Sequence, residues 1–321
     1  VERQHEGPTA PELAIRTQRL AKSYGPIRAL DGLDLEVRVG EVFGFLGPNG
    51  SGKTTTIRIL LDLIRPTDGS AEVLGLDPRR DGLALRRRVG YLGGEFVVEG
   101  RQTAAELLRY LGNLRGGIAP ERVEELTERF GLDPSRRISS LSRGNRQKVG
   151  VVQAFMHDPE LLILDEPTSG LDPVLQHEFA KLVGETAAAG RTVFMSSHVM
   201  SEVQRVADRV GILHRGRLST VEGIVALQQR ASRRVEIVFD PGTAIAPADF
   251  EAIPEVSEVV VDGDRMRCRL DGHADQLVKT AAHFGVATFT AEEPDLEELF
   301  FESYGSESSG SDGAAAHEER R

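Results

Sequence analysis

The sequence has very little cysteine, because Cys268 is the only one among 321 residues. A single cysteine excludes an internal disulfide and a cysteine cluster for zinc, so we expect no zinc site. This usage suits a reducing compartment.

Long apolar runs and an excess of basic residues are also missing. No run approaches the ~20 residues that cross a bilayer, and residues 1–13 lack the apolar core of a signal peptide. We therefore expect a soluble chain that reaches a membrane only through a partner. The 39 Lys and Arg against 50 Asp and Glu give a net charge of −11. That balance argues against a nucleic-acid binder with a broad basic surface, so we expect no nucleic-acid partner.

A phosphate-binding pattern is present at Gly47–Thr54, where GPNGSGKT fits GxxxxGK[ST]. Apolar residues 42–46 precede it and apolar residues at helical spacing follow, so the loop joins a buried strand to a helix. Lys53 is expected to reach the β- and γ-phosphates, and Thr54 to place its hydroxyl on Mg²⁺. The alternative, a glycine-rich turn before an ordinary helix, is disfavoured by the eight matching positions. The predicted nucleotide-binding residues are Gly47, Pro48, Asn49, Gly50, Ser51, Gly52, Lys53, Thr54 and Thr55.

Two adjacent carboxylates follow a second apolar run. Residues 161–164 are all apolar, as in a strand buried on both faces, and Asp165 and Glu166 come directly after them. They would lie at the carboxyl edge of the sheet, where the phosphate loop also lies. We expect Asp165 to hold Mg²⁺ through water and Glu166 to orient and polarise the attacking water. A helix cap or a turn is the alternative for this pair.

The distribution of apolar residues predicts an α/β fold of the P-loop NTPase type. A small antiparallel strand group precedes the phosphate loop, residues 95–158 read as an inserted helical subdomain, and strands and helices then alternate as in a mostly parallel sheet. The predicted organisation is a disordered lead at 1–12, an ATP-binding domain at 13–232, a small α+β domain at 233–304 and a disordered tail at 305–321. The small domain reads β-β-α-β-α, with its last helix at Asp295–Ser303.

The segment Leu141–Lys148, LSRGNRQK, is similar to the LSGGQ signature of ABC transporters. Together with the phosphate loop and the Asp-Glu pair, it makes residues 13–227 resemble the ATP-binding subunit of such a transporter. The resemblance implies that the signature begins a helix and contacts the γ-phosphate bound to a second copy. Ser142 and Gly144 carry over by position, whereas Arg143 and Asn145 depart from the consensus. A capped helix start without a ligand is the alternative for Leu141, Ser142, Arg143, Gly144 and Asn145.

Further positions take roles from the same resemblance. Tyr24 corresponds to the aromatic residue that stacks on adenine, with core packing as its alternative. His198 corresponds to the switch histidine, which would bind the γ-phosphate and hold Glu166. The segment that crosses the dimer interface, called the D-loop, corresponds to Ser169, Gly170, Leu171 and Asp172.

One departure concerns the metal. Where the family usually has a glutamine that touches Mg²⁺, this sequence has Gly94, which cannot supply a ligand. Glu95 is next, and its carboxylate is also a hard oxygen ligand; a surface glutamate is an equal alternative.

The C-terminal domain ends in PDLEELFF at residues 294–301, and with this segment it resembles the accessory domain of drug- and antibiotic-exporting ABC systems. Cys268, flanked by Met266 and Leu270, is expected to pack in its core, and Arg86–Arg88 to lie on a solvated face. The resemblance implies ATP hydrolysis coupled to export of a small hydrophobic molecule, with ATP and Mg²⁺, a second copy, a membrane permease and a place on the cytoplasmic face of the membrane. The alternatives are a soluble ABC-type ATPase acting on ribosomes or DNA, a regulatory nucleotide-binding module, and a transporter of another direction or substrate.

Overall fold

The computed structural model describes residues 12–94, 96 and 100–292. Residues 1–11 of the predicted lead, Glu95, the helix expected at Asp295–Ser303 and the predicted tail lie outside the described residues. The chain divides into two compact units, residues 1–222 and 223–321. The change in composition predicted a division at 233, but the helix α8 (Ile224–Arg230) groups with the second unit. Within the described residues, no helix combines the length and the apolar character needed to cross a bilayer.

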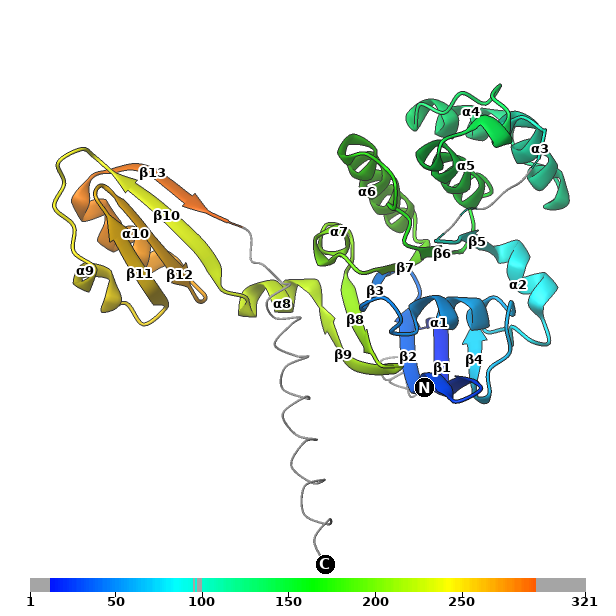
Figure 1. Ribbon diagram of the computed structural model, residues 1–321, viewed down its shortest axis with the longest axis horizontal. Coiled ribbons are helices and arrows are strands. Elements are labelled where there is room, and N and C mark those ends of the chain that lie inside the picture. The colour runs from blue at the N-terminus through cyan, green and yellow to red at the C-terminus, as the bar shows by residue number, and fades with distance from the viewer. Residues whose placement is uncertain (1–11, 95, 97–99, 293–321) are drawn as a thin grey trace, which may run out of the picture. The chain divides into compact units, whose positions relative to one another are not determined.

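A six-stranded sheet forms the centre of the first unit, in the order β5-β6-β7-β3-β8-β9 (Figure 1). Its strands are β3 (Val42–Leu46), β5 (Val89–Leu92), β6 (Leu161–Asp165), β7 (Thr192–Ser197), β8 (Arg209–His214) and β9 (Arg217–Gly223). The pairs β5/β6, β6/β7, β7/β3 and β3/β8 are parallel, which confirms the predicted mostly parallel sheet. Every residue of β3, β6 and β7 is buried, which explains the apolar runs at 42–46 and 161–164.

A three-stranded antiparallel sheet, ordered β2-β1-β4, lies beside the central sheet. It consists of β1 (Leu13–Tyr24) and β2 (Ile27–Arg38), as predicted for the segment before the phosphate loop, and of β4 (Asp68–Val73), which follows that loop in the chain. The buried Thr17 hydroxyl ties two strands together, because it donates to Leu33 O at 2.8 Å and accepts from Leu35 N at 3.0 Å. Apolar residues of both sheets and of α1 (Lys53–Leu60) share one core.

The predicted helical segment contains α3 (Ala104–Leu114), α4 (Pro120–Arg129) and α5 (Arg143–Phe155), which form one group in Figure 1. A capping box starts α3, where Thr103 and Glu106 each bind the other's backbone N–H. The remaining helices are α2 (Gly82–Arg88), α6 (Pro173–Ala188) and α7 (Met200–Gln204). Of the predicted solvated arginines, Arg86 and Arg87 are exposed, but Arg88 is partly buried and pairs with Glu160 at 2.6 Å.

Arg115 joins the helical group to the central sheet. Its Nη1 donates to Arg86 O at 3.0 Å and lies 2.7 Å from His157 Nε2, just after α5. The Nδ1 of His157 is buried without a hydrogen-bond partner. Burial, with the nearby Arg115 charge, lowers the pKa of His157 from 6.5 to about 4.

We expect acid to destabilise the first unit through His157. Between pH 6.5 and 4 the unfolded chain binds a proton that folded His157 does not, so stability falls as the pH falls through this window. The contribution is about 1–2 kcal/mol after allowing for the partial exposure of the ring. Urea unfolding of wild type and His157→Gln at pH 7 and pH 5 measures it, with the exposed His177→Gln as control. An acid-induced loss that is equal in all three proteins would contradict this assignment.

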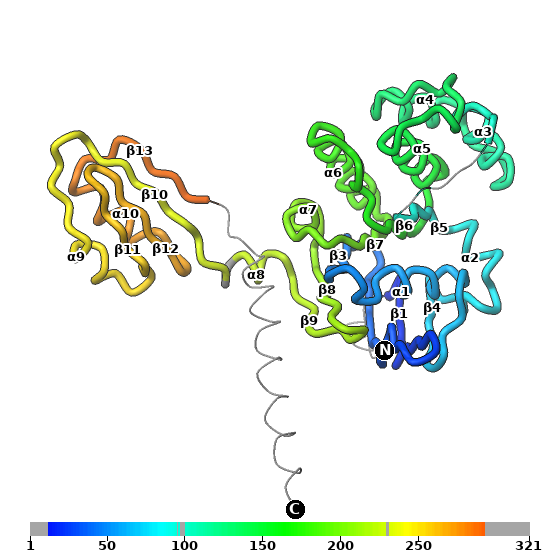
Figure 2. The backbone as a smooth tube through the Cα atoms, viewed as in Figure 1, coloured from blue at the N-terminus to red at the C-terminus, as the bar shows by residue number. Residues whose placement is uncertain are grey.

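The second unit is a four-stranded antiparallel sheet, ordered β11-β12-β10-β13, with helices on one face. Its elements are β10 (Arg233–Phe239), α9 (Ala248–Glu251), β11 (Val256–Asp262), β12 (Arg265–Leu270), α10 (Asp275–Ala281) and β13 (Val286–Ala291) (Figure 2). Phe239, Phe250 and Phe284 meet in its core. Cys268 is buried there as predicted, and burial raises the pKa of its thiol to about 11.

The sequence pattern did not predict β11 or α9. The strand β11 is irregular, since its pairing with β12 shifts register between Ser257 and Val260, and Glu258 has a φ of 52°. The alternation of apolar residues is therefore broken. The helix α9 is a single turn, too short for a periodic signal.

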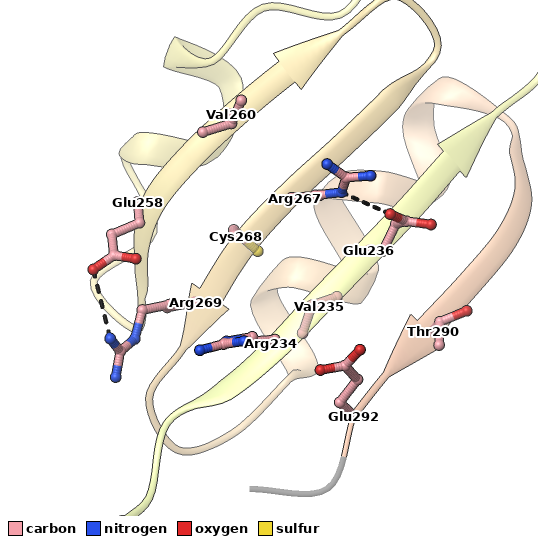
Figure 3. A pocket seen from close by; sticks show the side chains of 10 residues that line it. All are labelled: Arg234, Val235, Glu236, Glu258, Val260, Arg267, Cys268, Arg269, Thr290 and Glu292. Atoms are coloured by element: carbon pink, nitrogen blue, oxygen red, sulfur yellow. Dashed lines mark hydrogen bonds and ion pairs between the residues drawn. The ribbon is translucent and has the colours of Figure 1, made fainter. Parts of the chain in front are cut away.

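The other face of this sheet carries charged side chains (Figure 3). Glu236 on β10 binds Arg267 at 2.7 Å and Arg265 at 3.1 Å, both on β12, and Arg269 lies 3.6 Å from Glu258. These charges neutralise one another across the strands, as on an ordinary solvated sheet face.

Candidate nucleotide site

The phosphate loop joins β3 to α1, as its sequence predicts. Gly52 has a φ of 115°, and a Cβ there would lie 2.7 Å from Ala29 O, so only glycine fits. Lys53 is 6% exposed, and its Nζ donates to Gly47 O at 2.6 Å. The loop therefore holds the Lys53 ammonium group beside the start of α1, where backbone N–H groups can donate hydrogen bonds to phosphate oxygens.

Asp165 is fixed by two hydroxyl groups at the end of β6. Thr54 Oγ1 donates to its Oδ2 at 2.9 Å, and Ser196 Oγ donates to its Oδ1 at 2.6 Å. The sequence patterns did not predict this role for Ser196. Burial and the charge of Asp165 raise the pKa of Tyr91 above its ordinary value, so the phenol remains neutral.

Glu166 is held from three sides. His198 Nδ1 lies 2.7 Å from its Oε2, and Lys53 Nζ lies 3.5 Å from its Oε1. Its backbone N–H donates to Ser196 O at 3.2 Å. Glu166 also adopts the left-handed region, with a φ of 49°, which costs a non-glycine residue about 1 kcal/mol. Such strain persists where the surroundings over-determine the backbone, and it is common at functional sites.

These groups border one cavity of about 460 Å³. Among the predicted site residues, it is lined by Pro48, Asn49, Gly50, Ser51, Gly52, Lys53, Thr54, Thr55, Arg143, Asp165, Glu166, Ser169 and His198; Gly94 and Ala29 line it as well. Tyr24 does not line the cavity. Its side chain is 45% exposed, and Lys22 Nζ lies 5.0 Å from the ring centroid. The alternative prediction, that Tyr24 packs in the core, is therefore wrong.

The signature segment begins α5. Leu141 is buried, and Ser142 is the N-cap residue, whose Oγ accepts from Asn145 N at 3.3 Å. This cap also fits the alternative in which Ser142 binds no ligand. In the D-loop, Leu171 is buried and Asp172 caps α6 by accepting from Leu175 N at 3.0 Å.

The phosphate loop follows the buried strand β3, and the two carboxylates stand at the end of β6, which β7 separates from β3 in the sheet. This arrangement defines a P-loop nucleotide hydrolase. Comparison with known proteins narrows this class. The ABC transporter family model matches residues 30–169. The bacitracin transport ATP-binding protein BcrA of Bacillus licheniformis is 35% identical over 298 residues, which cover 91% of this chain and 97% of that protein.

Further similar proteins are also ATP-binding proteins of transport or resistance systems. The daunorubicin/doxorubicin resistance ATP-binding protein DrrA of Streptomyces peucetius is 40% identical over 215 residues, 65% of each chain. A solved ATP-binding subunit of an ABC transporter aligns with a TM-score of 0.62 and 28% identity, over 67% of this chain and 92% of that one. The chain belongs to the ABC transporter family of ATP-binding proteins, and is an ATPase.

Proposed function

We propose that this chain hydrolyses ATP to drive export of a small hydrophobic compound, such as an antibiotic, through a separate membrane permease. The support is the similarity to relatives named for bacitracin transport and for daunorubicin resistance. The match to the Bacillus licheniformis protein covers 91% of this chain, so it extends into the second unit. The chain would then act at the cytoplasmic face of the membrane, held there by the permease.

The geometry around Glu166 carries the proposed chemistry. Lys53 binds the β- and γ-phosphates, and Glu166, held by His198, accepts a proton from the attacking water and orients it. His198 also reaches the γ-phosphate. A carboxylate flanked by a histidine and a lysine in one cavity suits this role, because positioning and charge stabilisation dominate phosphoryl transfer.

The same cavity fits Mg²⁺. Thr54 and Asp165 present hard oxygen atoms 2.9 Å apart, and Mg²⁺ usually combines one or two protein oxygens with water and phosphate oxygens. The described residues contain no cluster of three or more acidic, histidine or cysteine ligands, so this site needs the phosphates of ATP to be complete. The ion would neutralise phosphate charge. Glu95, outside the described residues, remains a predicted further ligand.

We also propose a head-to-tail pair of chains. Ser142 and Gly144 of each copy would contact the γ-phosphate bound by the other, so each site is completed by a second copy. One similar solved cassette is dimeric, with a TM-score of 0.60 and 25% identity. In this arrangement Tyr24 would stack on adenine, consistent with its exposure.

We expect the chain to copurify in detergent with an integral membrane protein, and its ATPase rate to rise when the exported compound is added. Expressing this chain together with its permease should lower the sensitivity of cells to that compound. The control is the same permease expressed with the Glu166→Gln chain, which should assemble with it but hydrolyse ATP far more slowly. Copurification with ribosomes or DNA, without a membrane protein, would instead support the soluble ATPase alternative.

A further inference from the structure

The start of α5 is attached to the turn that follows Glu166. The buried Gln147 amide donates to Pro167 O at 2.9 Å. Gly144 approaches Gly170 so closely that a Cβ on Gly144 would lie 2.7 Å from Gly170 O. The third contact is a hydrogen bond from Arg143 Nη2 to Ser169 Oγ, 3.1 Å long. The signature segment is therefore joined by two contacts to the D-loop of its own chain, and by a third to Pro167, just before that loop.

Arg143 points from the signature segment toward the nucleotide cavity of its own chain. It lines that cavity together with Lys53, Glu166 and His198. Its aliphatic stem covers Gly170, since a Cβ at Gly170 would lie 3.8 Å from Arg143 Cγ. The side chain is thus directed at Ser169 by packing as well as by its hydrogen bond. A guanidinium so placed adds positive charge to a cavity that must accept phosphates.

We propose that Arg143 is a positioning residue for the nucleotide site of its own chain and not for the partner's site. This inference rests on the proposed function, because it needs Glu166 as the base and a second copy that completes each site. Arg143 acts through Ser169, whose backbone N–H donates to Glu166 O at 3.1 Å. By fixing Ser169, it keeps the turn closed behind the strained Glu166 and so holds the carboxylate against His198.

Mixing full-length chains separates an effect on the same chain from an effect on the partner. A trace of chain with intact Glu166 is mixed with a large excess of Glu166→Gln chain, so that nearly every active chain has an inactive partner. Arg143→Ala is then introduced either into the active chain or into the excess partner. The rate of the excess chain measured alone is subtracted, so that the remaining ATP hydrolysis comes from the site that carries Glu166, and its kcat and KM are measured for each mixture.

With Arg143→Ala in the active chain, we expect kcat to fall about tenfold or more, because a misplaced base loses rate steeply. With Arg143→Ala in the partner, kcat should stay at the value of the reference mixture. A loss only in the second mixture, equal losses in both, or no loss in either would overturn the proposal. If Glu166→Gln alone turns over ATP like wild type, Glu166 is not the base, and this inference fails with that assignment; export by the chain and its permease is tested separately by copurification.

Variants at Ser169 test the route from Arg143 to Glu166. Ser169→Ala should reproduce the fall in kcat, Ser169→Thr should retain most of the rate, and Arg143→Ala with Ser169→Ala should be no slower than Arg143→Ala alone. Arg143→Lys keeps one donor and should restore part of kcat. The melting temperature is recorded for every variant. A loss of rate that follows melting temperature instead of the Ser169 hydroxyl would contradict a positioning role.

Discussion

Replacing Glu166 with glutamine should lower the rate of ATP turnover by about 10²-fold or more while ATP still binds, because the amide cannot accept a proton from water. Glutamine keeps the size of the side chain and an oxygen for His198, whose Nδ1 lies 2.7 Å from Glu166 Oε2. The ion pair between Lys53 and residue 166 is lost, because glutamine is neutral, but Lys53 still donates to Gly47 O. Phosphate release and equilibrium binding of ATP measure the two effects separately.

The matched control is Glu121→Gln, an exposed position on α4. It removes the same charge without touching the cavity, so turnover should not change. Undiminished turnover in Glu166→Gln would show that another group activates the water. Loss of ATP binding in parallel with turnover would instead assign Glu166 to the folding of the loop.

Replacing Lys53 with alanine should weaken ATP binding by about 10²-fold, since charged hydrogen bonds to phosphate contribute roughly 1.5–3 kcal/mol each. Lys53 is almost fully buried beside Glu166, and its Nζ is the cation predicted to reach the β- and γ-phosphates. AMP lacks both phosphates, so its affinity should be unaffected. Titration of ATP and AMP against both proteins measures the difference.

Lys181→Ala on α6 is the control, because Lys181 is 55% exposed and pairs only at the surface with Glu178. An equal loss of affinity for ATP and AMP in Lys53→Ala would mean that the loop had collapsed, as the lost bond to Gly47 O could cause. Unchanged ATP affinity would remove Lys53 from the phosphate site.

The sequence predicted those parts of the site that depend on neighbouring residues. Two such parts are the phosphate loop, which directly follows β3, and the Asp165-Glu166 pair, which stands at the end of β6. Both strands are short apolar runs that are easily recognised in the sequence. The parallel order of β6, β7 and β3 then brings Asp165, His198 and the phosphate loop to one edge of the sheet.

Contacts between distant residues could not be predicted. The Ser196 hydroxyl reaches Asp165 because β6 and β7 pair in register, and Arg143 reaches Ser169 because α5 packs on the turn after β6. Neither fact follows from local periodicity. The left-handed backbone of Glu166 was also unforeseen, since glutamate has no preference for that conformation and only the surrounding hydrogen bonds impose it.

At Glu166 the requirements of stability and of activity conflict, because the side chain needed for catalysis stands on a left-handed backbone that lowers the stability of the fold. Glycine adopts a φ of 49° without penalty, and asparagine does so more readily than glutamate. A selection for heat-resistant variants would therefore favour substitutions here that relax the backbone, such as glycine or asparagine, and both of these remove the carboxylate. Engineering this ATPase for robustness should leave residue 166 fixed and look for gains in stability elsewhere, as at other sites where function requires strain.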